Sequence, residues 1–373
     1  MARTLDLSDL ELLSLSEALE GGREMARARL WKGGQITPPR PMLWPCPVDA
    51  LTEAHSRPSE APHADVQVIR EAVVGGGGSQ PTKDGAYVYA ATAYPGYIKA
   101  YLDQDITPEV WAFEPGRLRT IRVPRAFAVL HFNLMWGHWL TEVFPKLFAI
   151  RALAAMGVRA PILVPSNAPV YAARIIRDVL PGQELVTYDP ATHKVLVKQL
   201  IMPPMLQHFY VFHPRFGEAL DLYARPAGRP SSRLFVSRGG MRTAYAYREL
   251  VNEPELEAAA AETGFRIVRP EALPWREQLA LFAGARVIAG EFGSGLHNTL
   301  FSPHAAKVVA LNCIGDTQSR IANFRGQDIG YVLPDDGLPR VFHQERSLQR
   351  YRVDPSEFRE KLAIAVEAAE APA

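Results

Sequence analysis

The segment from Arg233 to Cys313 constrains the fold more than any other, because short apolar runs with strand character alternate in it with runs of helix character. The strand-like runs are RLFVSR, FRIVRP, RVIAGEF and KVVALNC, and the helix-like runs between them are EPELEAAAAETG, PWREQLALFAGA and GLHNTLF. Strands and helices that alternate at such short intervals are typical of parallel sheets with crossover helices. The segment therefore predicts an α/β fold with a doubly wound parallel sheet.

The preceding part of the chain is predicted to be a second α/β domain that begins with an antiparallel section. Its first strand-like runs, VQVIREAVV, AYVYAATAY and RLRTIRVP, are separated by breaks that contain glycine or proline. From Trp136 to Leu153, apolar residues recur every three or four positions, which predicts an amphipathic helix that Pro145 would kink. Further strands are expected at APILVP, ELVTY and VLVKQLIM, and further helices near residues 170–180 and 216–223.

Linker composition and helix signals set the expected boundaries. Residues 224–233 are rich in Pro, Gly, Ser and Arg, the composition of an exposed connection between domains. The chain starts with a Leu-rich run, read as an amphipathic helix, and continues with the extended run ITPPRPMLWPCP. Near the other end, Asp354 is placed to cap a helix that Pro355 begins. The expected parts are an N-terminal arm over 1–65, an α/β domain over 66–224, a second over 233–353 and a terminal helix over 354–373.

The composition of the 373-residue chain argues against several classes of protein. With 41 Lys and Arg against 40 Asp and Glu, the formal net charge is +1, so no positive field is expected to collect nucleic acid. No apolar run is long enough to predict a transmembrane segment. The two cysteines, Cys46 and Cys313, lie far apart without a metal-ligand spacing, so neither a disulfide framework nor a zinc site is expected. A reducing cytoplasm fits this cysteine usage best.

The most informative motif runs from Gly290 to Asn298 with the sequence GEFGSGLHN. It follows an apolar strand and precedes a short helix, the place where open α/β sheets bind ligands. Its glycines allow close approach of a phosphate or sugar, and amides at a helix start favour anions. Since the spacing matches neither the P-loop nor the dinucleotide fingerprint, a nucleotide-triphosphatase or NAD site is disfavoured. A tight turn without a ligand is the alternative.

A second motif, FVSRGGMR from Phe235 to Arg242, places two arginines and flexible backbone at the end of another strand. A planar guanidinium group donates two parallel hydrogen bonds, which suits Arg238 and Arg242 to a diphosphate. Either arginine taken alone is as consistent with an exposed surface residue. Because both motifs end strands of one predicted sheet, together they favour a nucleotide-diphosphate site.

A third motif contains His138 and Glu142, whose spacing of four places them on one face of the predicted helix. A histidine with a neighbouring carboxylate can hold one tautomer and act as a general base. The alternative is that His138 is a structural residue that forms hydrogen bonds. For a single histidine, this alternative is favoured. Without a third ligand, the pair is a poor metal site.

The segment from Arg233 to Leu311 resembles glycosyltransferase family 61, the group of bacterial capsule-type, plant xylan-decorating and animal N-acetylglucosaminyltransferases. The family pattern is Ser-Arg at a strand end, Arg-x-x-x-Asn-Glu, Pro-Glu, Gln-x-x-x-Phe and Gly-x-His-Gly-(Ala/Ser)-x-x-x-Asn-x-x-Phe. The matching residues here are Ser237-Arg238, Arg248 to Glu253, Pro270-Glu271, Gln278 to Phe282 and Gly290 to Phe301. The HWLTE run at 138–142 also resembles the family's upstream motif. One departure is Phe292, which stands where the family has the His of Gly-x-His-Gly.

This resemblance implies an enzyme of the GT-B type, in which two Rossmann-like domains face an interdomain cleft. Such an enzyme transfers a sugar, with inversion, from a nucleotide-diphosphate sugar to a hydroxyl of a glycan or lipid-linked saccharide, as in polysaccharide biosynthesis. No essential metal and no cofactor are expected, in keeping with the missing Asp-x-Asp motif in the nucleotide-binding half. The acceptor is assigned to the N-terminal half. A cytoplasmic location is expected, while peripheral membrane contact and the oligomeric state stay open.

The resemblance also gives roles to individual residues. The residues expected to hold the diphosphate are Arg238, Arg242, Gly293, Ser294 and Gly295. Asn298 and Glu271 are expected to touch the ribose, the base or the donor sugar. The candidates for the general base are, in order, His138, Glu142 and Glu291. Two other functions stay open: a non-catalytic nucleotide- or sugar-binding protein, which the departure at Phe292 keeps under consideration, and a sugar epimerase of similar fold.

Overall fold

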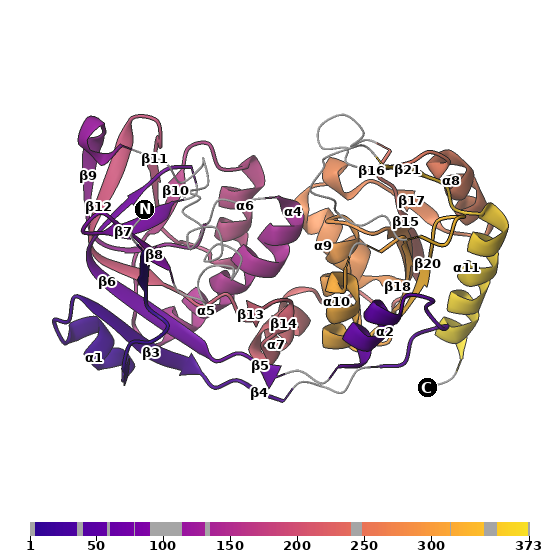
Figure 1. Cartoon of the computed structure of the whole chain (residues 1–373), viewed down its shortest axis with the longest axis horizontal. Coiled ribbons are helices and arrows are strands. Elements are labelled where there is room, and N and C mark those ends of the chain that lie inside the picture. Colours follow the sequence, from indigo (N-terminus) through magenta and orange to yellow (C-terminus); the bar gives the residue numbers. More distant parts are fainter. Residues whose placement is uncertain are drawn as a thin grey trace. The chain divides into compact units, whose positions relative to one another are not determined.

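The protein folds into two compact units, each with its own sheet (Figure 1). The structure is a computed structural model that describes residues 4–35, 40–57, 60–77, 79–89, 114–130, 135–239, 248–313, 315–338 and 349–371. Unit 1 comprises Met1–Gln35 and Glu60–Phe216, and unit 2 comprises Ile36–Ser59 and Gly217–Ala373. Each unit is therefore assembled from two separate stretches of the chain.

Unit 1 is built on a mixed sheet of ten strands. Its main path, in sheet order, is β1 (Thr4–Asp6), β8 (Ala86–Tyr89), β7 (Gln80–Lys83), β6 (Ala64–Gly75), β12 (His193–Met202), β9 (Arg119–Phe127), β10 (Ile162–Pro165) and β11 (Leu185–Tyr188), while β2 (Leu12–Leu13) and β3 (Met25–Trp31) lie off this path. Strands β6, β7 and β8 are antiparallel neighbours, as the pattern before the first α/β unit predicts. Strands β12, β9, β10 and β11 are parallel neighbours. The sheet therefore changes from antiparallel to parallel at β12.

The helices of unit 1 connect its parallel strands. Helix α4 (Trp136–His138), a π-helical turn (Trp139–Val143) and α5 (Phe144–Ala155) join β9 to β10, and α6 (Val170–Val179) joins β10 to β11. The first seven residues of α5, from Phe144 to Ile150, are all buried, so the first two turns of this helix are enclosed on every side rather than amphipathic as expected. Smaller elements are the 3₁₀ turn Pro115–Arg117, β4 (Gly34–Gln35), β5 (Glu60–Ala61), β13 (Gln207–His208), β14 (Val211–Phe212) and α7 (Pro214–Tyr223).

The prediction of a helix at the start of the chain is wrong. Leu5 and Leu7 flank Asp6, and this alternation belongs to a strand, so β1 pairs in parallel with β8 and Leu7 is fully buried in the core. The helix α1 (Leu15–Glu20) begins only at a capping box, in which Ser14 and Glu17 satisfy each other's backbone amides. The residues expected to form an arm are thus divided between the sheet of unit 1 and the core of unit 2.

Unit 2 contains a parallel sheet of five strands, and all of its neighbouring strands are parallel, as the alternation predicts. The sheet order is β17 (Arg266–Val268), β15 (Ser232–Val236), β18 (Ala285–Glu291), β19 (Lys307–Leu311) and β20 (Asp328–Val332). Helices α8 (Glu253–Glu262) and α11 (Pro355–Glu370) cover one face, and α9 (Trp275–Ala283) and α10 (Thr317–Arg325) cover the other (Figure 1). The run expected to form a helix after β18 is a 3₁₀ helix, η5 (Leu296–Phe301).

The order of the strands in unit 2 creates a switch point. The chain runs from β15 outward to β17, then returns to the other side of β15 as β18 and continues to β19 and β20. The connections that leave β15 and β18 therefore depart in opposite directions, which opens a crevice at the carboxyl ends of these two strands. Open α/β sheets bind their ligands at such a crevice.

Two further segments complete unit 2. Residues 40–57, which include α2 (Asp49–Ser56), run beside the edge strand β20, where the Leu43 amide donates to the Ile329 carbonyl oxygen over 2.9 Å. At the other end, the Asp354 side chain accepts from the Ser356 amide over 2.8 Å and Pro355 begins α11, as predicted. Phe358, together with other apolar residues of α11, is buried in the core of unit 2, so α11 is an integral helix of that unit.

Candidate functional site

The switch point of unit 2 brings the two glycine-rich motifs together. Strand β15 pairs with β18 so that Val236 lies opposite Gly290. A Cβ atom at Gly290 would lie 2.7 Å from the Val236 carbonyl oxygen, so only glycine allows this approach. Ser237 and Arg238 follow the end of β15, next to the residues that end β18. The two motifs therefore form one site at the carboxyl edge of the sheet.

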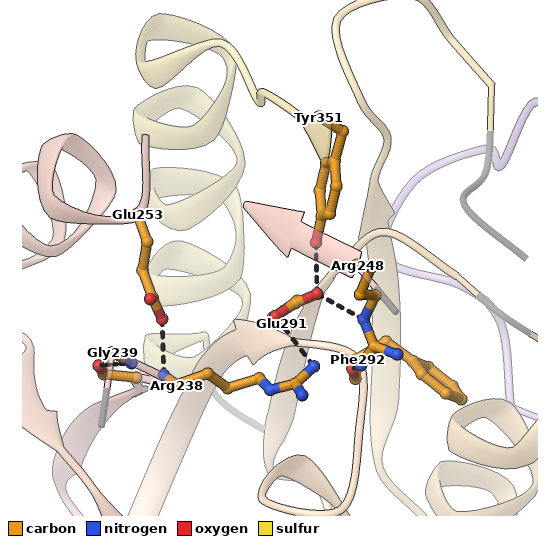
Figure 2. A network of polar contacts seen from close by, with 8 residues as sticks. Arg238, Gly239, Arg248, Glu253, Glu291, Phe292 and Tyr351 are labelled. Atoms are coloured by element: carbon orange, nitrogen blue, oxygen red, sulfur yellow. Dashed lines mark hydrogen bonds and ion pairs between the residues drawn. The ribbon is translucent and has the colours of Figure 1, made fainter. Parts of the chain in front are cut away.

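Glu291 is the centre of a buried polar network at this edge (Figure 2). One of its carboxylate oxygens accepts from Nε of Arg248 over 2.5 Å and from the Tyr351 hydroxyl over 2.7 Å. The other oxygen accepts from Nη1 of Arg238 over 3.1 Å. The side chains of Glu291 and Arg248 are 5% and 2% exposed, whereas that of Arg238 is 26% exposed. Arg238 is thus the member of the network that solvent or a ligand can reach.

The oxygen atoms of Glu291 are already engaged in this network. Two guanidinium groups and a phenol donate to them. Burial, with the neighbouring carboxylate, raises the pKa of Tyr351 well above its usual value, so the phenol stays a hydrogen-bond donor. Two roles of Glu291 can be compared: positioning two arginines, and its predicted role as the third candidate for the general base. The geometry favours the positioning role.

Arg238 is held at both its backbone and its side chain. Its amide donates to Oε1 of Glu253 over 2.6 Å, and the next amide, that of Gly239, donates to the Ser237 hydroxyl over 3.1 Å. The backbone of Gly293 runs beside the guanidinium groups at a φ of +152°, which disfavours a side chain there. A Cβ at Gly293 would lie 2.9 Å from Nη2 of Arg248. Gly293 therefore leaves room for two cations beside one stretch of backbone.

The other predicted ligand residues divide into two groups. Ser294 and Gly295 are half-buried beside the network, and a Cβ at Gly295 would lie 3.1 Å from Cγ1 of Val236. Asn298 is fully buried, and its side chain donates to the Gly295 carbonyl oxygen over 2.9 Å, so one role of this residue is to hold the turn. Glu271 is exposed in the 3₁₀ turn Pro270–Ala272, which follows β17 at the same edge of the sheet. Arg242 lies outside the described residues.

Two members of the network had been given no role from the sequence. Arg248 and Tyr351 lie on β16 (Arg248–Leu250) and β21 (Gln349–Tyr351), which pair in parallel and place Arg248 two residues from Tyr351 in register. Arg248 opens the Arg-x-x-x-Asn-Glu motif, and each fixed position of this motif makes a contact. Arg248 binds Glu291, Asn252 binds the Val353 backbone in both directions, and Glu253 binds the Arg238 amide. The motif was a usable signal for Arg248, whereas Tyr351 had none.

In unit 1, the third motif follows the carboxyl end of β9. Nδ1 of His138 lies 2.7 Å from Oε1 of Glu142, as their spacing predicts. The His138 side chain is 21% exposed and that of Glu142 is 3% exposed. The π-helical turn begins directly after His138 and includes Glu142, and Pro145, which has no N–H to donate, is the second residue of α5. The irregularity expected at Pro145 is therefore a widened turn at the histidine pair.

A buried lysine extends this pair by one more helical turn. Lys146 is 1% exposed, and its Nζ donates to the Val129 carbonyl oxygen over 3.0 Å, just past the end of β9. Burial lowers the pKa of Lys146 from 10.5 to about 7, although the Glu142 carboxylate acts in the opposite direction. His138, Glu142 and Lys146 thus form a column of titratable side chains along one helix. We call these three residues the histidine column.

Two searches of the described part of the chain gave negative results. No group of three or more His, Cys, Asp or Glu side chains there is arranged to hold a metal ion. No helix in the described ranges is long and apolar enough to cross a membrane. Cys46 and Cys313 are buried free thiols.

The comparison with protein families is consistent with the two sites. The model of the family described as Glycosyltransferase 61 matches residues 136–309. A search of curated proteins found no match to the chain. The matched segment begins just before the histidine column and contains Arg238, Arg248 and Glu291 of the network. This match bears out the resemblance seen in the sequence motifs: residues 136–309 of the chain are similar to glycosyltransferase family 61.

Proposed function

We propose that the protein is an inverting glycosyltransferase that moves a sugar from a nucleotide-diphosphate sugar to a hydroxyl of a glycan or lipid-linked saccharide. The observation that carries the proposal is the network of Arg238, Arg248 and Glu291 at the switch point of unit 2, within the segment that matches the family. A GT-B arrangement of the two units, a cytoplasmic location and a role in polysaccharide biosynthesis belong to the same proposal.

In this proposal unit 2 binds the leaving group. The guanidinium group of Arg238 has donors that Glu291 does not use, and they suit a diphosphate because guanidinium–phosphate hydrogen bonds are charge-assisted. Glu291 and Arg248 fix its orientation in advance, which lowers the cost of ordering the site when charge develops on the departing diphosphate. Arginine donors of this kind take the place of a metal ion, so we expect catalysis without a metal or other cofactor.

Unit 1 provides the general base. The carboxylate of Glu142 can only accept, so its 2.7 Å contact places the proton of the neutral imidazole on Nδ1 and leaves Nε2 of His138 as the acceptor. Nε2 takes the proton of the acceptor hydroxyl while the oxygen of that hydroxyl bonds to the anomeric carbon. The bond from that carbon to the diphosphate oxygen breaks, and the diphosphate leaves with the electron pair. One displacement of this kind inverts the anomeric configuration.

Nucleotide release from a panel of UDP-, GDP-, TDP- and CMP-sugars tests this function. We expect turnover of a diphosphate sugar in the presence of an oligosaccharide acceptor, and we expect it to persist in EDTA. If chelation abolished turnover and manganese or magnesium restored it, a metal ion rather than the arginines would be the main group that stabilises the leaving diphosphate.

Calorimetry of nucleotide binding tests the site. Arg238→Ala should weaken a nucleoside diphosphate by about 1.5–3 kcal/mol, roughly 10- to 150-fold, and leave the free nucleoside nearly unchanged. Arg359→Ala is the matched control, because Arg359 is an arginine of unit 2 whose side chain is 44% exposed and pairs with Glu262. Equal losses for diphosphate and nucleoside in Arg238→Ala would exclude a diphosphate role for this residue.

A non-catalytic binding protein is the second candidate, because Phe292 occupies the family's histidine position. The Phe292 ring is 7% exposed and lies edge-on to His297, with the ring centroids 5.9 Å apart. Nucleotide-diphosphate binding without turnover of any sugar in the panel would favour this candidate.

A further inference from the structure

Unit 2 has a pocket that no residue of the Glu291 network lines. Its volume is about 570 Å³, within the range of about 300–1,000 Å³ usual for ligand sites. It opens beyond the carboxyl end of β20, beside the first turns of α11. The lining residues that carry the argument are Trp44, Asp335, Arg352, Asp354, Glu357 and Lys361, and prolines make up much of the remaining wall.

The floor of this pocket is an indole ring that is fixed in place. Nε1 of Trp44 donates to the Tyr331 carbonyl oxygen over 2.9 Å. A Cβ at Gly330 would lie 2.3 Å from Cζ2 of Trp44, so the ring rests directly on the backbone of β20 and any side chain at residue 330 would displace it. Nζ of Lys361 lies 5.6 Å from the ring centroid. Trp44 is thus an apolar ring held against β20, and the Lys361 side chain must move off it before a ligand can cover the ring.

The lining also contains charged side chains, and its two cations, Arg352 and Lys361, are already paired with carboxylates. Arg352 makes two contacts of 3.1 Å with the carboxylate of Glu255, and Lys361 lies 3.0 Å from the carboxylate of Glu360. By contrast, Asp335 and Glu357 are exposed carboxylates, and the structure gives their side chains no hydrogen-bond partner among the described residues. The pocket therefore offers acceptor oxygens and little free positive charge, which disfavours a phosphorylated ligand.

We infer that this pocket binds a neutral saccharide. A pyranose ring has an apolar face of C–H groups that packs against an aromatic ring, and hydroxyls at its edge that donate to carboxylates. Trp44 provides the first surface once the flexible Lys361 side chain moves off its ring, and Asp335 and Glu357 provide the acceptors. The pocket would hold a part of the glycan acceptor away from the reacting hydroxyl. Only this last assignment rests on the proposed function, because saccharide binding requires no transfer.

Binding of xylohexaose, cellohexaose and maltohexaose to the full chain tests the inference in the absence of any donor. Ligand-detected NMR shows which oligosaccharide binds, and calorimetry gives its affinity. The double variant Asp335→Ala/Glu357→Ala changes exposed side chains only and should weaken binding by at least about tenfold. Trp44→Phe, which keeps a ring but loses the Nε1 donor, should also weaken it. Glu367→Ala, an acidic position on α11 that does not line the pocket, is the matched control and should leave binding unchanged.

Three results would overturn the inference. The first is that none of the three oligosaccharides binds at millimolar concentration. The second is that one binds with equal affinity to the double variant and to Glu367→Ala. The third is that the double variant loses UDP rather than oligosaccharide binding, which would assign the pocket to the nucleotide. Saccharide binding without glycosyl transfer would instead contradict the proposed function and leave this inference standing.

Discussion

The histidine column of unit 1 and the Glu291 network of unit 2 hold a buried carboxylate in two different ways. Each follows the carboxyl end of a parallel strand and keeps a buried carboxylate next to a basic side chain. The column takes all its residues from one helix, at a spacing of four. The network collects Arg238, Arg248, Glu291 and Tyr351 from four separate segments of the chain.

This difference decides how each group responds to loss of its carboxylate. Lys146 can release its proton near neutral pH, whereas arginine stays charged at every pH that a protein experiences. The column can therefore relax to a neutral state, but the network cannot. The comparison teaches that the network is the more rigid and the more costly of the two to break.

The largest effect is expected for Glu291→Ala. This variant leaves the buried Arg248 and the half-buried Arg238 without their shared carboxylate, and removal of one partner from a buried ion pair costs about 3–5 kcal/mol of unfolding free energy. Denaturant unfolding of the full chain measures this loss. Glu142→Ala should lose less, since Lys146 then becomes neutral. Equal losses of unfolding free energy in the two variants would contradict the view that the network is more costly to break than the column.

The next effect concerns turnover. His138→Ala should lower kcat by about a hundredfold or more, while nucleotide affinity stays nearly unchanged, because a general base acts on the acceptor proton and not on the donor's nucleotide. Glu142→Gln should cost less if Glu142 only orients His138, and more if Glu142 is itself the base. A folded His138→Ala protein with normal turnover, judged by steady-state kinetics and its melting temperature, would remove His138 from the mechanism.

The effect that is smallest for each pH unit is the pH dependence that Lys146 adds to stability. Its pKa is about 7 in the folded chain and near 10.5 in the unfolded chain, so between these values the unfolded chain binds more protons. Stability should therefore rise with pH in this window, by up to about 1.4 kcal/mol per pH unit relative to Lys146→Met. Denaturant unfolding at pH 6, 7, 8 and 9 measures the difference.

Lys198→Met is the control for this titration, because Lys198 is an exposed lysine on β12 of the same unit. Its stability difference from the unmodified chain should stay flat over the same pH range. A flat difference for Lys146→Met as well would show that Lys146 keeps its proton on folding and remains a cation in the column over this pH range.

Much of unit 2 followed from the sequence because its strands are short, apolar and separated by clear helix signals. The start of the chain did not, because Leu5, Leu7, Leu10 and Leu13 fit a helical spacing almost as well as the strand alternation that β1 adopts. Partners that lie elsewhere in the chain decided between the two: β8 supplies hydrogen bonds to β1 that no local pattern contains.

The two candidate sites were predictable to different degrees for the same reason. His138 and Glu142 are four residues apart, so their contact follows from helix geometry alone. Glu291 and Tyr351 are 60 residues apart in sequence, and their contact exists only because the fold brings β21 to the end of β18. The sequence showed Lys146 only as a charged residue in an apolar helix. The fold showed that the first two turns of this helix are enclosed on every side.

The segment that runs beside β20 has a consequence for the order of events during synthesis. Arg40 forms its ion pair with Asp328, 288 residues later in the chain. At about 5–20 residues per second, a ribosome needs roughly 15 to 60 s to cover that separation, long enough for unit 1 to begin folding on its own. During that interval Trp44 has no β20 to rest on, so its neighbourhood is available to chaperones. A fragment that starts at residue 217 lacks this segment altogether and would leave the long side of β20 open to pairing with another chain.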